Sequence, residues 1–485
     1  MPRVPCKSTG GLSLAQAFRP ANGRPAALKG CATFSFSTHS DTLLVVPALS
    51  FACVIALVMT ACTPSRVTAA LVETDRYLTE SADLERYFAY ANAALGRPYQ
   101  SFYVRPAAEW RRVFDRGDRQ RASDLPTLRP ARRLVPYRDF LVEYPPGFFL
   151  VSIPPALVAT SAHGYAIAFG VFMALLLLSS VAVCAAVAPF TGVPVSRAAL
   201  TVWVLVAASG LGTVVTHRYD AAVALLICTM CWATLAGRPA VLGVATGAAV
   251  AIKIVPVLAG LVCAAYLLRE RRARDLAIAA SLALLTLVLI CGPVFLAAPS
   301  GLLDTVRYHV DRPLEIGSTA AALLGLWHMV DPGAVSVIRT YGSSNVVGRF
   351  SGAAVAASNV ASVLGVMVVC AAARRGLKVA RTPSGRARVL LAAIAAVLAV
   401  VIATGKVASP QYLVWVLPIG VLATLIDRRW ISLALLMATL VLSHMIYAAL
   451  LGDLEALRPW ALALVLARNI TLVAWTVTIA GGARQ

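Results

Sequence analysis

The sequence predicts an all-α polytopic membrane protein, on the strength of its composition, its apolar runs and its basic connecting segments. Of its 485 residues, 59% are hydrophobic and only 13% are charged, whereas soluble domains carry about 25% charged residues. Apolar runs of about 15–25 residues recur along the chain, the length that a helix needs to cross a bilayer. Transmembrane barrels show short alternating strands instead. We therefore expect a bundle of about 12 transmembrane helices with two long extracytoplasmic loops.

The positive net charge of +21 orients this bundle and does not indicate binding to nucleic acid. Many Lys and Arg residues stand in short segments between apolar runs, and such segments stay in the cytoplasm. Two are strongly basic, namely 269–274 ("RERRAR") and the stretch 374–388. We place both inside and expect no nucleic-acid partner.

The ten cysteines do not suggest a disulfide framework. None of them falls in 64–146 or 299–348, the two segments that we place outside the cytoplasm, where disulfides would form. Cys228 and Cys231 have redox spacing but lie within an apolar run, so we expect a buried structural pair.

The N-terminal part divides at changes of polarity. Residues 1–41 are polar and basic and are predicted to be a disordered cytoplasmic tail. The first span is expected at 42–63, and 64–146 must then form the first extracytoplasmic loop. Residues 147–162 are apolar but short and contain Pro154 and Pro155, so we expect a helix that lies at the membrane interface.

A broken helix is the next unusual feature. Residues 239–268 carry Lys253 and Pro256 in their middle. A single crossing there would put the basic segment 269–274 outside, whereas two half-helices that meet near Lys253 put it inside. Broken helices at membrane depth line cavities.

The remaining apolar runs complete the prediction. We expect spans at 165–188, 198–215, 219–236, 276–298, 350–372, 389–404, 409–426, 431–450 and 460–480. The domain plan is then a catalytic membrane module over 42–298, a second extracytoplasmic loop over 299–348 and C-terminal helices over 349–485.

Polar residues inside or beside a bilayer are costly and mark function by default. In this topology they gather on the outer face: Asp83, Glu85, Asp139, Glu143, Tyr144, Arg218, Asp220, Lys253, His309, Asp311, Arg312, Glu315, Lys406, Gln411 and Tyr412. Taken singly, each is more often a solvated loop residue or a helix cap, and Asp220 in particular suits a helix N-terminus. Together they set carboxylates beside cations on one membrane face.

Acids beside cations suit glycosyl transfer from a lipid phosphate. A carboxylate or an imidazole removes the proton of the acceptor hydroxyl, and Lys and Arg hold the phosphate leaving group. A metal site would need clustered carboxylates or His-rich spacing, and the sequence shows neither, so we expect no metal and no other cofactor.

Six stretches in this order resemble the polyprenol-phosphate-dependent glycosyltransferases of family 87, which have the GT-C membrane fold. They are "ADLERYFAYANAALGRPY", "VPYRDFLVEYPPG", "THRYDAAVALL", "GVATGAAVAIKIVP", "YHVDRPLEIGS" and "SPQYLVWVLP", and the resemblance covers residues 42–480. It implies an inverting enzyme that moves mannose from a polyprenyl phosphate to a lipid-linked glycan or a phosphatidylinositol mannoside. It also implies a multi-pass protein of the plasma membrane, in contact with its lipids, with the active site on the extracytoplasmic face.

The resemblance also implies roles for single residues. Asp83 matches the usual base of the fold, and His309 shares or takes that role. Arg312 is expected at the donor phosphate, and we add Lys253 there because it is a cation beside carboxylates. The other residues line the cavity or the acceptor site: Glu85, Asp139, Glu143, Tyr144, Arg218, Asp220, Gln411 and Tyr412.

The sequence departs from the family pattern in three places. Residues 100–134 look inserted and belong to a region with nine arginines between 104 and 136; they form either a solvated loop or a site for an anionic head group. "EIGS" stands where Glu and Ser should be adjacent, which puts the role of Glu315 in doubt. The tail 1–41 is longer than such enzymes need.

Three alternatives remain open at this point. An arabinofuranosyltransferase of cell-wall glycan would share the same motifs. A secondary transporter would also have intramembrane charges and a broken helix. A non-catalytic scaffold or flippase partner would keep the fold without the chemistry.

Overall fold

A computed structural model describes residues 82–109 and 128–482. The expected tail 1–41 and first span 42–63 lie outside the described residues. So does the middle of the arginine-rich insert, residues 110–127.

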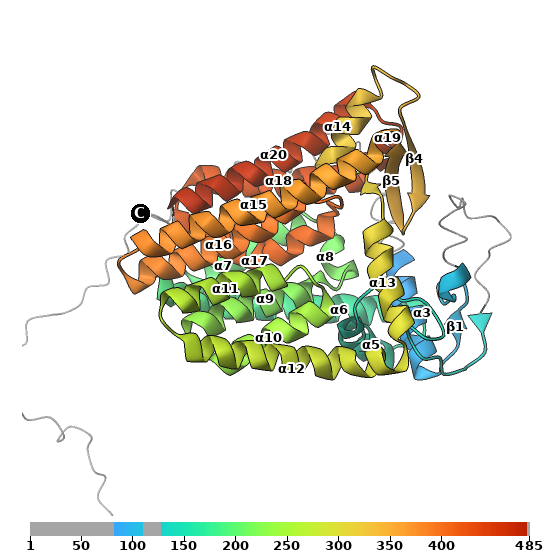
Figure 1. Cartoon of the computed structure of the whole chain (residues 1–485), viewed down its shortest axis with the longest axis horizontal. Coiled ribbons are helices and arrows are strands. Elements are labelled where there is room, and N and C mark those ends of the chain that lie inside the picture. Colours follow the sequence, from blue (N-terminus) through green and yellow to red (C-terminus); the bar gives the residue numbers. More distant parts are fainter. Residues whose placement is uncertain (1–81, 110–127, 483–485) are drawn as a thin grey trace, which may run out of the picture. The chain divides into compact units, whose positions relative to one another are not determined.

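Helices dominate the described residues, which confirms the all-α class (Figure 1). The helices are α3 (Ala82–Leu95), η2 (Pro146–Phe148), α5 (Phe149–Val158), α6 (Ala162–Val187), η3 (Ala188–Thr191), α7 (Arg197–Ser209), α8 (Val214–His217), α9 (Asp220–Leu235), α10 (Pro239–Ile252), α11 (Val257–Arg269), α12 (Ala273–Ala297), α13 (Pro299–Asp311), α14 (Thr319–Trp327), α15 (Ser351–Val379), α16 (Pro383–Thr404), η4 (Pro410–Tyr412), α17 (Leu413–Asp427), α18 (Trp430–Ala448), α19 (Leu451–Glu455) and α20 (Pro459–Gly482).

The strands are few and short. They are β1 (Tyr99–Gln100), β2 (Leu128–Arg129), β3 (Leu314–Glu315), β4 (Val335–Thr340) and β5 (Ser343–Gly348). β1 pairs antiparallel with β2, and β5 lies between β3 and β4, antiparallel to both.

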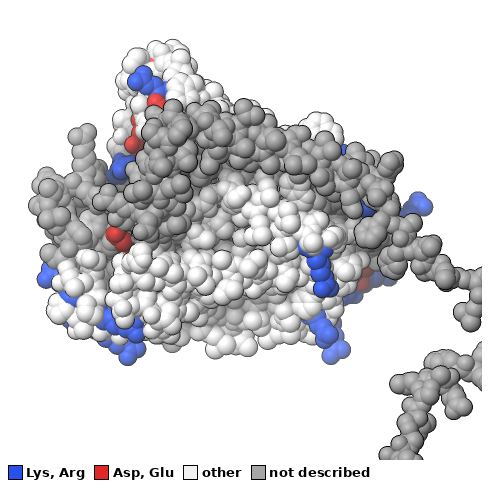
Figure 2. Space-filling view, turned by 180° about the vertical axis from the view of Figure 1, so that it is seen from behind, with Lys and Arg blue, Asp and Glu red and all other residues white. Residues whose placement is uncertain are grey.

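Seven helical segments of the described chain are long and apolar enough to cross a membrane. They are Ala162–Thr191, Ala273–Ala297, Ser351–Val379, Pro383–Thr404, Pro410–Asp427, Trp430–Ala448 and Pro459–Gly481. In α12 only Ala279 is fully buried, so one side of this apolar helix is left exposed. Figure 2 shows a face whose described part is free of charged side chains across its middle, with Lys and Arg toward two ends. The chain is therefore a multi-pass membrane protein.

The broken helix predicted over 239–268 is present as α10 and α11. Between them Lys253 is extended (φ −158°, ψ 136°) and Pro256 precedes the first residue of α11. α10 packs closely on α12 at Gly243 and Gly247. A Cβ at Gly243 would stand 2.5 Å from the Ala279 carbonyl oxygen, so the helices can approach this far only because both residues lack side chains.

Two predicted boundaries were wrong for local reasons. The span expected at 198–215 ends as a helix at Ser209, because the chain turns at Gly210 and Gly212, and Gly212 has φ +63°. The basic segment 374–388 is mostly helical. α15 continues to Val379, and α16 begins at Pro383, where the Thr382 side chain accepts a hydrogen bond from Gly385 N.

The segment 299–348, predicted as the second extracytoplasmic loop, has secondary structure of its own. It contains α13, α14 and the β4–β5 hairpin, whose turn residues Tyr341 and Gly342 both have positive φ. Residues of α14, of the strands and of α20 share one buried apolar cluster, which gives these short elements a core of their own.

The segments predicted inside contact one another at one end of the helices, and the segments predicted outside contact one another at the other end. Arg386 pairs with Glu270 at 2.5 Å and thereby joins the two basic segments that were predicted inside. The segments predicted outside meet elsewhere: Tyr308 of α13 donates to Tyr341 O of the hairpin, and Arg86 of α3 lies against the Gly342 turn. Figure 1 shows α3, α13, α19 and the hairpin at one end of the helices.

Candidate active site

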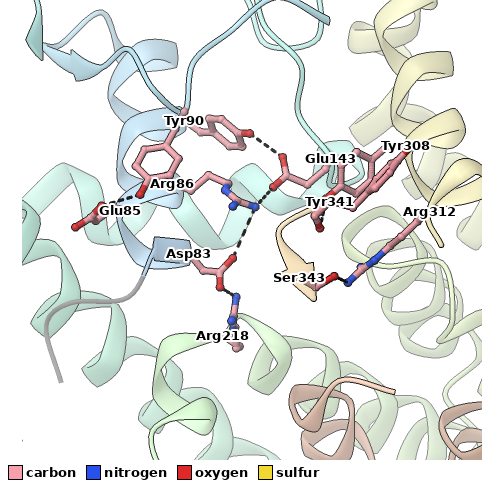
Figure 3. Close-up of polar contacts among 11 residues, drawn as sticks. Asp83, Glu85, Arg86, Tyr90, Glu143, Arg218, Tyr308, Arg312, Tyr341 and Ser343 are labelled. Carbon is pink, nitrogen blue, oxygen red and sulfur yellow. Dashed lines mark hydrogen bonds and ion pairs between the residues drawn. The ribbon is translucent and has the colours of Figure 1, made fainter. Parts of the chain in front are cut away.

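Asp83 stands in the first turn of α3, where the helix dipole favours a negative charge. Its carboxylate forms an ion pair with Arg218, which lies just before α9, and a weaker one with Arg86 Nη1 at 3.8 Å (Figure 3). The side chain is 16% exposed. Asp83 is therefore held between two cations while part of it stays accessible.

Aromatic rings hold α3 in place. Tyr87 lies one turn after Asp83, and its ring centroid is 5.1 Å from that of Phe148, 5.6 Å from that of Tyr144 and 5.8 Å from that of Tyr219. Tyr144 stacks on Phe148 at 4.6 Å. The predicted site residue Tyr144 is thus a packing residue between α3 and the start of α9.

Glu143 is the buried acid of the site. It is 5% exposed, and its carboxylate accepts hydrogen bonds from Arg86 Nη1 at 2.5 Å and from Tyr90 OH at 2.7 Å. A buried carboxylate is tolerated when it is paired in this way. Its backbone oxygen lies 2.8 Å from His309 Nε2, so Glu143 connects the first loop to α13.

The bend after Glu143 explains the sequence "EYPPG". A Cβ on Gly147 would stand 2.6 Å from the backbone oxygen of Ala251, near the end of α10. Only glycine permits this approach, and it brings the Glu143 loop next to the break at Lys253. Pro145 and Pro146 fix the backbone that makes the bend.

Asp139 and Glu85 have other surroundings. Asp139 accepts from Val135 N at 2.7 Å and pairs with the exposed Arg138, whose hydrogen bond holds the pKa of the carboxyl below its usual value. Glu85 accepts from Tyr103 OH at 2.7 Å. Neither carboxylate joins the group formed by Asp83, Arg86 and Glu143.

Asp220 and Lys253 form a second ion pair at 2.6 Å. Trp415 Nε1 donates to the same carboxylate oxygen of Asp220. The ammonium of Lys253 lies 4.6, 5.0 and 4.9 Å from the ring centroids of Tyr219, Tyr412 and Trp415, distances typical of cation–π contacts. Through these contacts Lys253 connects the break between the half-helices α10 and α11 to α9 and α17.

α13 supplies His309 near its end, and Arg312 follows directly. The Glu143 carbonyl can only accept, so Nε2 of His309 carries the proton and Nδ1 is the acceptor of the neutral ring. Burial lowers the pKa of His309, and the hydrogen bond with Glu143 opposes this shift. By its surface area the residue as a whole is exposed.

Arg312 differs from the other cations of the site. Among the described residues no carboxylate forms an ion pair with it. Its Nη2 donates to Ser343 Oγ at 2.8 Å, and its Nε is buried without a partner (Figure 3). The charges of Arg218, Lys253 and Arg312 act on one another, so this is a concentrated positive region.

Arg218 links the positive region to Asp83. Burial lowers its pKa to about 10, so the guanidinium stays protonated at neutral pH. Its side chain nevertheless keeps 26% of its surface exposed. The group is thus surrounded by protein and still accessible from one side.

The last two predicted residues lie in η4, directly before α17. Tyr412 stacks on Trp415 at 4.5 Å and covers Lys253. Gln411 belongs to η4 and is partly exposed. Among residues 82–109 and 128–482, no three His, Cys, Asp or Glu side chains are grouped as metal ligands.

Several members of this region were not predicted from the sequence. Arg86 stands three residues after Asp83, which is the spacing of neighbours on a helix face, and that signal was available. A lone arginine in an apolar span, Arg468, was an equally clear signal. Tyr90, Ser343 and Trp415 carry no such signal, since only packing brings them here.

Comparison with known proteins identifies the family. The model of glycosyltransferase family 87 matches residues 140–410. Two similar solved structures are crystal structures of ArnT from Cupriavidus metallidurans. For the one bound to undecaprenyl phosphate, the identity is 17% and the TM-score 0.38, with 87% of this chain and 78% of that chain covered. For the apo state, the identity is 17% and the TM-score 0.38, with 86% and 76% covered. None of the curated proteins matches the chain.

The family match decides the class of protein. Residues 140–410 are more than half of the 485 residues and include Glu143, Asp220, Lys253, His309 and Arg312. The predicted resemblance and the enzyme class are confirmed, and the transporter alternative falls. The chain is a membrane enzyme that belongs to glycosyltransferase family 87.

Proposed function

We propose that this glycosyltransferase moves mannose from a polyprenyl phosphate to a lipid-linked glycan or a phosphatidylinositol mannoside, with inversion at the anomeric carbon. The observation that carries the proposal is Arg312. It is a cation without a carboxylate partner among the described residues, and it shares a positive region with Arg218 and Lys253. A phosphate monoanion or dianion is the natural ligand of such a guanidinium group.

The chemistry follows from the neighbours of this region. The acceptor hydroxyl attacks the anomeric carbon on the side opposite the phosphate, and Asp83 takes its proton. The bond between the anomeric carbon and the acceptor oxygen forms while the bond to the phosphate oxygen breaks. The phosphate leaves with the electron pair, and Arg312 and Arg218 stabilise its added charge.

Arg218 has a double part in this proposal. Without substrate it forms an ion pair with the Asp83 carboxylate. A donor phosphate beside Arg218 competes for the same guanidinium, so donor binding leaves Asp83 with the weaker Arg86 contact at 3.8 Å. The base then becomes available once the donor is in place.

Lys253 contributes charge rather than a direct contact in this proposal. Its ammonium is already bonded to Asp220 and enclosed by three rings. Arg312 and Arg218 are the groups with free hydrogen-bonding capacity. We assign Glu85, Gln411 and the surroundings of Tyr103 to the acceptor site.

The donor is tested directly with purified protein in nanodiscs. We expect transfer from polyprenyl-phosphate mannose, no transfer from GDP-mannose, and no loss of activity with EDTA. Transfer from the arabinofuranose donor alone would change the sugar and keep the mechanism. Direct use of GDP-mannose, or activity lost with EDTA and restored by Mg²⁺ or Mn²⁺, would refute the donor chemistry.

Arg312→Ala tests the phosphate contact. A charge-assisted hydrogen bond is worth about 1.5–3 kcal/mol, so the donor KM should rise about ten- to a hundredfold, with a smaller change in the acceptor KM. Arg307→Ala is the matched control, because Arg307 lies on α13 close to Arg312 in the chain, is 56% exposed and pairs with Asp304. Equal effects of the two variants would contradict the assignment.

The extracytoplasmic placement of the site is tested by cysteine labelling. Ser300 and Ala273 are both exposed, at the start of α13 and of α12. In a background without native cysteines, Ser300→Cys should react with an impermeant thiol reagent from outside, and Ala273→Cys only after the membrane is opened. The reverse pattern would place the site on the cytoplasmic face.

A further inference from the structure

Arg468 lies within α20 and is fully buried, with 0% of its surface exposed. α20 is one of the seven helices that can cross a membrane. A charged side chain at this place is costly and is kept only where its contacts compensate. Its partners therefore indicate its purpose.

Both hydrogen-bond partners of Arg468 are backbone carbonyls of segments beside the site. Nη1 donates to Ala408 O at 3.1 Å, and Nη2 donates to Gly317 O. Ala408 belongs to the connection between α16 and η4, and Gly317 to the connection between β3 and α14. One guanidinium thus ties together two segments that are far apart in the sequence.

Glu315 forms a second tie between the same two segments. It is 3% exposed, and its carboxylate accepts from Ala408 N at 3.1 Å and from Tyr447 OH at 2.6 Å. Its backbone N donates to Lys406 O at 2.9 Å. A Cβ on Gly317 would collide with the Tyr447 hydroxyl, which explains why glycine follows Ile316 in "EIGS".

These ties lead directly to Arg312. Lys406 Nζ donates to Val310 O at 2.8 Å and to Arg312 O at 2.9 Å. β3 pairs with β5, and Ser343 of β5 is the acceptor of Arg312 Nη2. The backbone position of Arg312 therefore depends on how the segment 312–317 is held against the segment 405–408.

We propose that Arg468 is a positioning residue for the donor phosphate. It holds the carbonyls of Gly317 and Ala408 together and so fixes the backbone from which Arg312 extends. This rests on the proposed function, in which Arg312 contacts the phosphate. Arg468 itself touches neither donor nor acceptor, and it lies outside the residues 140–410 that match the family model.

The planar guanidinium group explains why this residue is an arginine and not a lysine. Its two terminal nitrogens reach two carbonyls at once, whereas the single nitrogen of lysine cannot keep the same geometry. Without Arg468, Gly317 O loses this donor, and Ala408 O keeps only the contact with Tyr447 OH at 3.4 Å. Tyr447 OH donates to the Glu315 carboxylate and also contacts Ala408 O, so this carboxylate lies close to the groups that Arg468 holds.

Steady-state kinetics with polyprenyl-phosphate mannose test the proposal. Arg468→Met keeps a long side chain and removes every donor. We expect its donor KM to rise about ten- to a hundredfold, because a misplacement of about 1 Å costs up to about 10²-fold, with the acceptor KM unchanged. Arg468→Lys should lie between Arg468→Met and the wild type. Thr478→Val, which removes a bond between α20 and Ser432 of α18, is the control and should leave the donor KM unchanged.

The double variant separates positioning from general destabilisation. If Arg468 acts through Arg312, then Arg312→Ala with Arg468→Met has the donor KM of Arg312→Ala alone. Effects that multiply, or a loss of kcat with both KM values unchanged, would overturn the proposal. Should Arg468→Met fail to fold, Arg468→Lys and Tyr447→Phe decide, since a wild-type donor KM in both would refute it.

The same set distinguishes this proposal from the proposed function. An unchanged donor KM in Arg312→Ala shows that the phosphate site is elsewhere. A raised donor KM in Arg312→Ala together with a normal one in the Arg468 variants rejects only the positioning role.

Discussion

Two ion pairs of the site involve neighbouring residues, Arg218 and Asp220, and differ in their surroundings. Arg218 pairs with Asp83, and two residues later Asp220 pairs with Lys253. The first pair has side chains that are 26% and 16% exposed. In the second pair Lys253 is 14% and Asp220 1% exposed, and Trp415 and two tyrosines complete the enclosure. We therefore propose that the first pair exchanges partners with a substrate, whereas the second has a structural role at the break between α10 and α11.

The largest expected effect breaks the first pair. Asp83→Asn keeps the shape and removes the proposed base, so turnover should fall about 10²–10⁴-fold while the thermal unfolding midpoint stays close to that of the wild type. Asp275→Asn, at the start of α12 where the carboxylate pairs with Arg272, is the control and should lose much less. Near wild-type turnover in Asp83→Asn, together with a loss in His309→Ala, would move the base to His309.

Breaking the second pair should act on stability. Asp220→Asn leaves the ammonium of Lys253 without its carboxylate, and uncompensated buried charges cost about 3–5 kcal/mol. We expect a lower unfolding midpoint in detergent and less folded protein. Adding Lys253→Met should restore much of the stability, because both charges are then gone. A double variant as unstable as Asp220→Asn would show that the pair is not structural.

Arg218→Gln sharpens the comparison from the cation side. It removes a contact to the phosphate that is worth about 1.5–3 kcal/mol, so the donor KM should rise about ten- to a hundredfold, with stability nearly unchanged. Arg138→Gln serves as the control, since Arg138 is exposed and pairs with Asp139. A drop in stability as large as that of Asp220→Asn would remove the distinction between the two pairs.

The smallest effect concerns pH and His309. The pKa of His309 is lowered in the folded protein, so the unfolded chain binds a proton first. Its contribution to stability is complete above about pH 6.5 and is lost as the pH falls through the folded pKa. The unfolding midpoint should therefore drop more between pH 7.5 and pH 5.5 in the wild type than in His309→Gln. Equal drops would show that His309 does not titrate in this range.

The helices and the break at Lys253 were predictable because local rules control them. A bilayer requires about 20 apolar residues per crossing, and the basic segments settle the parity of the crossings. Both rules concern residues that are close together in the chain, so the sequence alone is enough to apply them. The helix end at Gly210–Gly212 was predicted wrongly, and the short elements within 299–348 were not predicted, because turn geometry and a small buried core decide both.

The sequence by itself determined the membrane class, the family and the identity of most polar residues on one face. Only the tertiary structure decided their partners, namely that Asp83 meets Arg218, that Glu143 meets Arg86 and that Asp220 meets Lys253. Each of the last two pairs joins residues at least 33 positions apart. The strength of a charge pair depends on distance and exposure, and packing sets both.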